Sequence, residues 1–143
     1  MQGFDKKNNS KKKKASISGI KPSQEEIINQ AIKFHLKGNI PEATKYYQYC
    51  INQGFENHIV LSNYGGILQG QGKLQEAEFS YRKAIKIKPD YANAHSNLGN
   101  ILRDLGKLKE AEVSTRKAIE LNPNFANAHS NLGNILRDLG KLK

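Results

Sequence analysis

ANAHSNLGNILRDLGKLK, the segment at residues 92–109, occurs again without a change at residues 126–143. The two copies are offset by 34 residues, and a fixed period of this length indicates a solenoid built from stacked supersecondary units. Extended backwards along the chain, the same frame gives full units at 24–57, 58–91 and 92–125 and a partial unit at 126–143. The period therefore predicts an array of short units, each packed on the next.

Each unit contains two stretches in which apolar residues recur at helical spacing. Gly106 separates the two stretches of the third unit, and Asn122-Pro123 closes the second, because proline cannot continue a helix. Gly72 and Gly38 occupy the equivalent position in the earlier units. The pattern predicts two antiparallel helices per unit, joined by tight turns, and an all-α fold.

Small residues recur where the two helices of a unit must approach closely. With each unit numbered from one, positions 8, 20 and 27 hold Ala31, Gly65, Gly99 and Gly133, then Ala43, Ala77 and Ala111, then Cys50, Ala84 and Ala118. This pattern resembles the tetratricopeptide repeat (TPR) family. The resemblance implies a right-handed superhelical solenoid with three full repeats and one unpaired helix. Thr115 replaces the aromatic residue of position 24 (Tyr47, Tyr81), so we expect looser packing in the third unit.

The N-terminal segment 1–22 carries seven lysines against one aspartate and contributes most of the formal net charge of +10. It lacks apolar periodicity and a secretory signal, and we expect a disordered, solubilising tail. The run Lys11–Lys14 leaves nucleic acid, acidic membrane or an import receptor as alternatives. No arginine or aromatic side chain interrupts the lysines, so binding to nucleic acid or acidic membrane is not the expected role. The capping box Ser23–Glu26 places the start of the solenoid, residues 23–143.

Residues with catalytic or metal-binding chemistry do not form a recognisable site. His95 and His129 lie one repeat apart and are expected to fill packing positions rather than share a metal. The serines lack a nucleophile motif, and no glycine-rich phosphate loop follows a strand. We expect no enzymatic activity, no cofactor and no metal. The single cysteine, Cys50, is expected to be buried and fits a reducing cytoplasm.

An asparagine occupies position 6 of every unit: Asn29, Asn63, Asn97 and Asn131. In the TPR family the first helix of each unit lines the concave groove, and position 6 faces inward. A carboxamide both donates and accepts, so a row of them can bind an extended peptide backbone. This ladder is similar to the one in O-linked N-acetylglucosamine transferases, which holds extended protein substrate; the alternative is a solvated surface residue. The remaining candidate groove residues are Asn93, Asn100, Arg103, Asn127, Asn134 and Arg137.

These features predict a non-catalytic scaffold that binds an extended peptide or partner protein in its concave groove. The alternative is a substrate-recruiting arm, or a truncated fragment, of a larger glycosyltransferase- or sulfotransferase-type enzyme. Ile28 and Ile32 stand where the carboxylate-clamp subset of the family has Lys and Asn, so capture of a chaperone C-terminus is not expected.

The fourth unit contains no second helix, so its leucines Leu132, Leu136 and Leu139 are expected to be exposed. A fragment, end-to-end self-association through the uncapped helix, and a tolerated lone helix are the three explanations, and the first is favoured.

Overall fold

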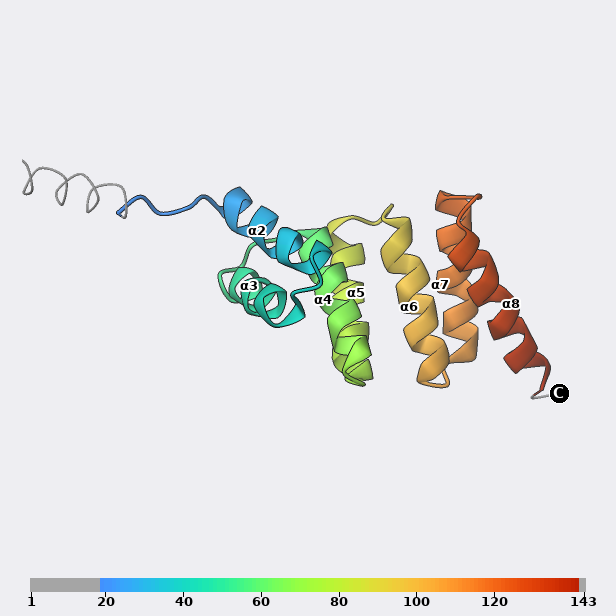
Figure 1. Ribbon diagram of the computed structural model, residues 1–143. Coiled ribbons are helices and arrows are strands. Elements are labelled where there is room, and N and C mark those ends of the chain that lie inside the picture. Colours follow the sequence, from blue (N-terminus) through green and yellow to red (C-terminus); the bar gives the residue numbers. More distant parts are fainter. Residues whose placement is uncertain (1–18, 142–143) are drawn as a thin grey trace, which may run out of the picture.

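The structure, a computed structural model, describes residues 19–141, which contain α-helices and no β-strand (Figure 1). The seven helices of this part of the chain are α2 (Gln24–Leu36), α3 (Ile40–Asn52), α4 (His58–Gly70), α5 (Leu74–Ile87), α6 (Ala92–Asp104), α7 (Leu108–Leu121) and α8 (Ala126–Gly140). Helices α2 and α3, α4 and α5, and α6 and α7 pack as pairs, and α8 packs on the last pair. The predicted all-α solenoid of three helix pairs and one unpaired helix is confirmed. Of the tail predicted to be disordered, residues 1–22, residues 1–18 lie outside the described range.

Glycines reverse the chain inside each helix pair. Gly38, Gly72 and Gly106 have φ angles of 77°, 76° and 78°. A residue with a side chain would be strained in this left-handed region, whereas glycine adopts it readily. After each glycine, the next amide donates to a carbonyl five residues earlier, as Asn39 does to Phe34 at 2.9 Å. This Schellman arrangement satisfies the last carbonyls of the first helix, and it confirms the helix breaks predicted at these glycines.

Side-chain caps define the start of the first helix in the first two pairs. The Ser23 hydroxyl accepts from the Glu26 amide at 3.1 Å, and the Asn57 carboxamide accepts from the Val60 amide at 3.0 Å. Each cap satisfies an amide that has no partner within its helix. The predicted start of the first helix at Ser23 is therefore confirmed.

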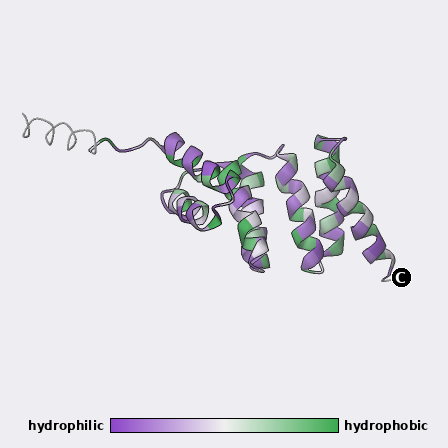
Figure 2. Ribbon diagram, viewed as in Figure 1, coloured by the Kyte–Doolittle hydropathy of each residue, from purple (hydrophilic) through white to green (hydrophobic). Residues whose placement is uncertain are grey.

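Small residues bring the two helices of a pair into contact. Ala43, Ala77 and Ala111 are completely buried, and a Cβ built on Gly65 would lie 2.9 Å from the ring of Tyr81. Apolar and polar residues are interspersed along the helices (Figure 2). The residues that are buried recur at helical spacing, so one face of a helix packs into the core. Cys50 is also completely buried, as predicted.

Thr115 fills the position that tyrosines occupy in the first two pairs. It is completely buried, and a Cβ on Gly99 would collide with its hydroxyl. Among the described residues, its Oγ1 is the one buried side-chain polar atom that lacks a hydrogen-bond partner. The expected weakness of the third unit is thus an unsatisfied hydroxyl rather than loose packing.

The unpaired helix α8 buries more of its apolar face than the sequence suggested. Ile135 is completely buried in the core cluster that includes Leu102, and Leu139 packs against the same cluster. Leu132 is half-buried, and Leu136 alone of the three predicted leucines is exposed, with 42% of its surface accessible. The expected row of exposed leucines is therefore wrong in part, because α8 packs on both α6 and α7.

Candidate functional site

The first helices of the pairs form one continuous face. Helix α2 lies beside α4, α4 beside α6, and α6 beside α8, whereas within residues 19–141 the second helices α3, α5 and α7 do not pack against one another. Because the first helices approach each other more closely, the stack curves toward them, and their common face is the concave side. We call this surface, formed by α2, α4, α6 and α8, the first-helix face.

The four asparagines of the ladder lie on this face but differ in their surroundings. Asn29 is exposed, and Asn63, Asn97 and Asn131 are half-buried. Asn63 donates through Nδ2 to the Tyr47 hydroxyl at 3.0 Å, and Asn131 donates to the Ser96 hydroxyl at 3.4 Å. Asn63 and Asn131 are therefore held by hydrogen bonds to the protein, whereas the carboxamides of Asn29 and Asn97 make no hydrogen bond to another residue of the described range 19–141.

A buried tyrosine determines how Asn63 is oriented. Tyr47 is completely buried, and its hydroxyl also lies 2.9 Å from Nδ1 of His35. Burial raises the pKa of Tyr47 despite the hydrogen bond from Asn63, so the phenol stays protonated. With Asn63 donating to the phenol oxygen, the phenol O–H is free to donate a hydrogen bond to Nδ1 of His35 when that nitrogen is unprotonated, and Oδ1 of Asn63 is left to accept from a ligand. From the sequence, Tyr47 was expected only as the packing aromatic of position 24, whereas His35 was expected among the inward-facing residues of the first unit.

The equivalent tyrosine one repeat later does not hold its asparagine. The Tyr81 hydroxyl lies 3.3 Å from Oε1 of Gln69, and burial raises the pKa of Tyr81 to about 12. Gln69 and His35 occupy the same repeat position, so each tyrosine bonds within its own pair, but only Tyr47 also receives an asparagine. Tyr81 and Asn97 have the same 16-residue offset as Tyr47 and Asn63, so the spacing in the sequence does not by itself predict this contact.

The arginines of the predicted groove are tied to neighbouring side chains. Arg103 donates through Nε to Asp138 at 2.6 Å, joining α6 to α8, and Arg137 donates to Asn134 at 2.6 Å. The hydrogen bond from Arg103 holds the pKa of Asp138 below its usual range. Asn93 and Asn127 are exposed, and Asn100 and Asn134 are half-buried.

Position 5 does not contribute to the surface as the family pattern implied. Ile28, Ser62 and Ser96 are all buried, because the next first helix covers them. Ser130 on α8 is exposed. At the α2 end of the face, the accessible apolar side chains are the highly exposed Leu36 and the half-buried Ile32.

The two histidines expected to fill packing positions instead bind the preceding turns. His95 Nε2 lies 2.7 Å from the carbonyl of Pro89, and His129 Nε2 lies 2.7 Å from that of Pro123. Across residues 19–141, no three His, Cys, Asp or Glu side chains are grouped to hold a metal ion. In the same range, no helix has the length and apolar character needed to cross a membrane.

Comparisons with known proteins agree with this architecture. Profiles described as tetratricopeptide repeat match residues 92–125 and 115–143, and one described as TPR repeat matches residues 67–102. The uncharacterized protein YgeG of Escherichia coli is 32% identical over 81 residues, which cover 54% of this chain and 50% of YgeG. The chain thus spans about half the length of this relative. It belongs to the tetratricopeptide repeat family.

Solved structures share the fold. The first TPR domain of Spaghetti (RPAP3), bound to the HSP90 peptide SRMEEVD, superposes with a TM-score of 0.73 and 24% identity, over 80% of this chain and 90% of that one. The O-GlcNAc transferase of Thermobaculum terrenum (mutant K341M) superposes with a TM-score of 0.73 and 24% identity, over 82% of this chain and 23% of the transferase chain. At this identity the likeness establishes the fold.

Proposed function

We propose that the chain is a non-catalytic scaffold that holds an extended segment of a partner protein on its first-helix face. The ladder Asn29, Asn63, Asn97 and Asn131 would bind the backbone of that segment. The observation that carries the proposal is the hydrogen bond from Asn63 to Tyr47, which presents Oδ1 of the asparagine to the face in advance. Pre-ordering a binding group in this way lowers the entropy lost on association.

The four asparagines would bind the ligand backbone in two different ways. Asn63 and Asn131 have Nδ2 committed to the protein, so each would accept one backbone N–H of the ligand. Asn29 and Asn97 would both donate and accept, as a free carboxamide can. The flanking polar residues would add adaptable contacts; they are Asn93, Asn100, Arg103, Asn127, Asn134 and Arg137.

The ligand would be an internal segment rather than a free C-terminus. A C-terminal carboxylate needs cations or strong donors on the face. Position 5 of the first unit is the buried Ile28, and position 9 is the half-buried Ile32, so neither supplies one. This distinguishes the chain from the RPAP3 domain that was solved with the peptide SRMEEVD.

Selection from a phage-displayed library of random linear peptides tests the proposal. The variant is Asn29→Ala/Asn97→Ala, since the side chains of these two asparagines make no hydrogen bond within the part of the chain that the structure describes and their removal should not disturb the fold. Each lost hydrogen bond is worth about 1 kcal/mol, so selected peptides should bind roughly tenfold to thirtyfold more weakly. The control Asn52→Ala/Asn124→Ala removes two exposed carboxamides outside this face and should bind normally. Equal binding by the ladder variant and the control contradicts the proposal.

A second candidate is a substrate-recruiting arm of a larger glycosyltransferase-type enzyme. It is favoured by the fold shared with part of the Thermobaculum terrenum O-GlcNAc transferase. In that case the same face would deliver substrate to a catalytic domain. The genomic sequence following the codon for Lys143 distinguishes the two candidates, because the second requires a transferase domain encoded there or in an adjacent gene.

A further inference from the structure

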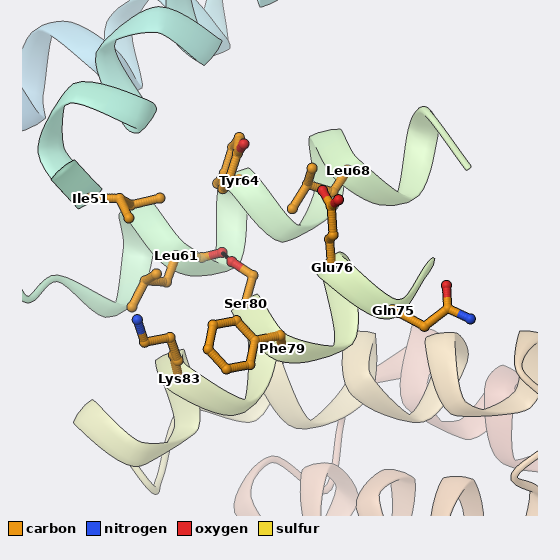
Figure 3. A pocket seen from close by; sticks show the side chains of 9 residues that line it. All are labelled: Ile51, Leu61, Tyr64, Leu68, Gln75, Glu76, Phe79, Ser80 and Lys83. Carbon is orange, nitrogen blue, oxygen red and sulfur yellow. Dashed lines mark hydrogen bonds between the residues drawn. The ribbon is translucent and has the colours of Figure 1, made fainter. Parts of the chain in front are cut away.

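Apolar furrows recur on the outer side of the stack, between successive second helices. The furrow between α3 and α5 encloses about 400 Å³ (Figure 3), and the furrow between α5 and α7 encloses about 600 Å³. Every residue that lines the first furrow has a counterpart 34 positions later in the second. Leu68 and Leu102 form one such pair, and Phe79 and Val113 form another. The furrows are therefore a product of the repeat itself, and we call them the outer furrows.

Their shape follows from the curvature of the stack. The first helices touch along the concave side, so the second helices separate on the other side and leave a slot between them. In the furrow between α5 and α7, Leu98 and Leu102 of α6 form the floor, and Ile85 and Val113 form opposite walls. Val113 is 71% exposed, and its counterpart Phe79 is 63% exposed. Such a concentration of apolar surface is typical of a binding site.

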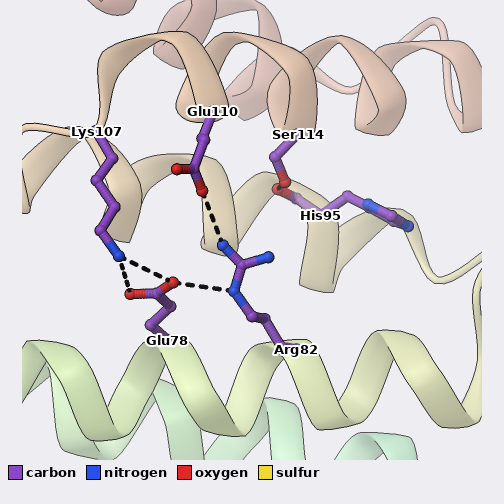
Figure 4. Close-up of polar contacts among 6 residues, drawn as sticks. All are labelled: Glu78, Arg82, His95, Lys107, Glu110 and Ser114. Atoms are coloured by element: carbon purple, nitrogen blue, oxygen red, sulfur yellow. Dashed lines mark hydrogen bonds and ion pairs between the residues drawn. The ribbon is translucent and has the colours of Figure 1, made fainter.

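Ion pairs hold the two walls at a fixed separation (Figure 4). Arg82 of α5 binds Glu110 of α7 at 3.1 Å and Glu78 at 2.9 Å, and Lys107 binds Glu78 at 3.1 Å. Burial disfavours the charged form of Glu78, but the hydrogen bonds from Arg82 and Lys107 hold its pKa below the usual range. The ion pairs therefore join the two sides of this furrow at its edge.

The charges around this furrow are predominantly positive. Arg82, Lys109 and Lys117 line it, together with one carboxylate, Glu110, which is paired with Arg82. Lys117 contacts the exposed Glu120 at 3.2 Å, and Lys109 makes no ion pair with any described residue. An apolar slot with cationic edges complements a segment that has an apolar stripe and acidic flanks.

We propose that the furrow between α5 and α7 binds an amphipathic helix of a partner protein, with an aliphatic stripe and acidic flanks. A slot with one helix on each side and a third as its floor has the geometry in which a further helix packs. Aliphatic side chains of the ligand enter between Ile85 and Val113, and its carboxylates meet Lys109 and Lys117. This furrow opens between the second helices, on the side of the stack away from the first-helix face, so both surfaces can be occupied at once.

Fluorescence anisotropy with the full chain and a labelled synthetic helix tests this proposal. The probe is a helix of Ala, Leu and Glu with leucines along one face, and its counterpart carries Lys in place of every Glu. Wild type should bind the acidic helix at least tenfold more tightly than the basic helix. Val113→Glu places a charge on an exposed residue and should weaken binding of the acidic helix about tenfold, with an unchanged melting temperature.

Two further variants make the result specific. Lys109→Glu/Lys117→Glu leaves the apolar walls intact and should reverse the preference toward the basic helix, which keeps the test valid if Val113→Glu is poorly folded. Asn29→Ala/Asn97→Ala removes ladder rungs and should bind the acidic helix normally. The proposal is overturned if wild type binds both helices equally, if the double charge reversal has no effect, or if the ladder variant loses the acidic helix.

Discussion

Asn63 of α4 donates to the hydroxyl of Tyr47 on α3 at 3.0 Å, across the boundary between the first two helix pairs. The same hydroxyl contacts His35, so one buried phenol joins three helices. The bond holds the Asn63 carboxamide against the buried phenol. A core residue of the preceding repeat therefore determines how the surface residue Asn63 can hydrogen-bond to a ligand. Repeats that share a sequence pattern need not bind a ligand in the same way.

Replacing Tyr47 with Phe should release Asn63 while preserving the aromatic core. The ring remains, but Asn63 loses its acceptor and His35 loses its hydrogen-bond partner. We expect a loss of about 1 kcal/mol in the free energy of unfolding, and faster hydrogen exchange at the side-chain amide of Asn63. The measurements are chemical denaturation and two-dimensional NMR of the asparagine amide groups.

Tyr81→Phe provides the matched control for this change. Tyr81 is equally buried, but its hydroxyl contacts Gln69 and no asparagine. Loss of the Tyr81 hydroxyl should lower the free energy of unfolding by a comparable amount without altering the side-chain amide signals of Asn63 or Asn97. If both variants disturb the Asn63 amide equally, the effect is a general loosening of the core and Tyr47 has no specific orienting role.

Tyr81 should also limit stability at high pH. Its pKa rises from the ordinary value of 10 to about 12 because burial disfavours the phenolate. An acid whose folded pKa exceeds its unfolded pKa loses stability as pH rises between those values, here from pH 10 to 12, by about 2 kcal/mol in total. Over that range, wild type should lose more stability than Tyr81→Phe, measured by denaturation at each pH. Parallel curves for the two proteins would show that the phenol ionises without penalty.

The repeat frame and the helices follow from sequence because they depend on local patterns. Gly38, Gly72 and Gly106 end helices wherever they occur in the frame, and the buried alanines mark helix contacts. The ladder could also be placed on one face from its position alone. These features need only the period of the repeat and the periodicity of a helix.

Contacts between units could not be predicted in the same way. Ser62 and Ser96 lie on the first helices but are buried, because successive first helices approach more closely than a single unit reveals. The outer furrows were missed because Phe79 and Val113 appear in sequence as isolated exposed apolar residues. Both features arise from the curvature of the stack, which one repeat does not encode by itself.

The ion pair between Arg103 and Asp138 should make the attachment of α8 dependent on pH. The hydrogen bond from Arg103 lowers the pKa of Asp138. The ion pair therefore stabilises the folded protein fully above the ordinary carboxylate pKa, and this stabilisation is lost as pH falls through the lowered pKa. At neutral pH, Asp138→Asn should speed hydrogen exchange in α8. Asp104→Asn changes the same repeat position without breaking the pair and is the control. Equal exchange in both variants would mean that α8 is held by its apolar contacts alone.

Thr115→Val should stabilise the protein, because valine has nearly the same shape and removes a hydroxyl that has no partner. The buried, unsatisfied Oγ1 lies against Gly99, so no hydrogen bond is lost with it. We expect a gain of about 1 kcal/mol in the free energy of unfolding, measured by urea denaturation. Thr44→Val is the control: the Thr44 hydroxyl donates to the Ile40 carbonyl at 2.7 Å in an exposed position, and its loss should change stability by less than about 0.5 kcal/mol. A destabilised Thr115→Val would mean that the extra methyl group crowds Gly99, and then the third repeat is limited by space rather than by the unsatisfied hydroxyl.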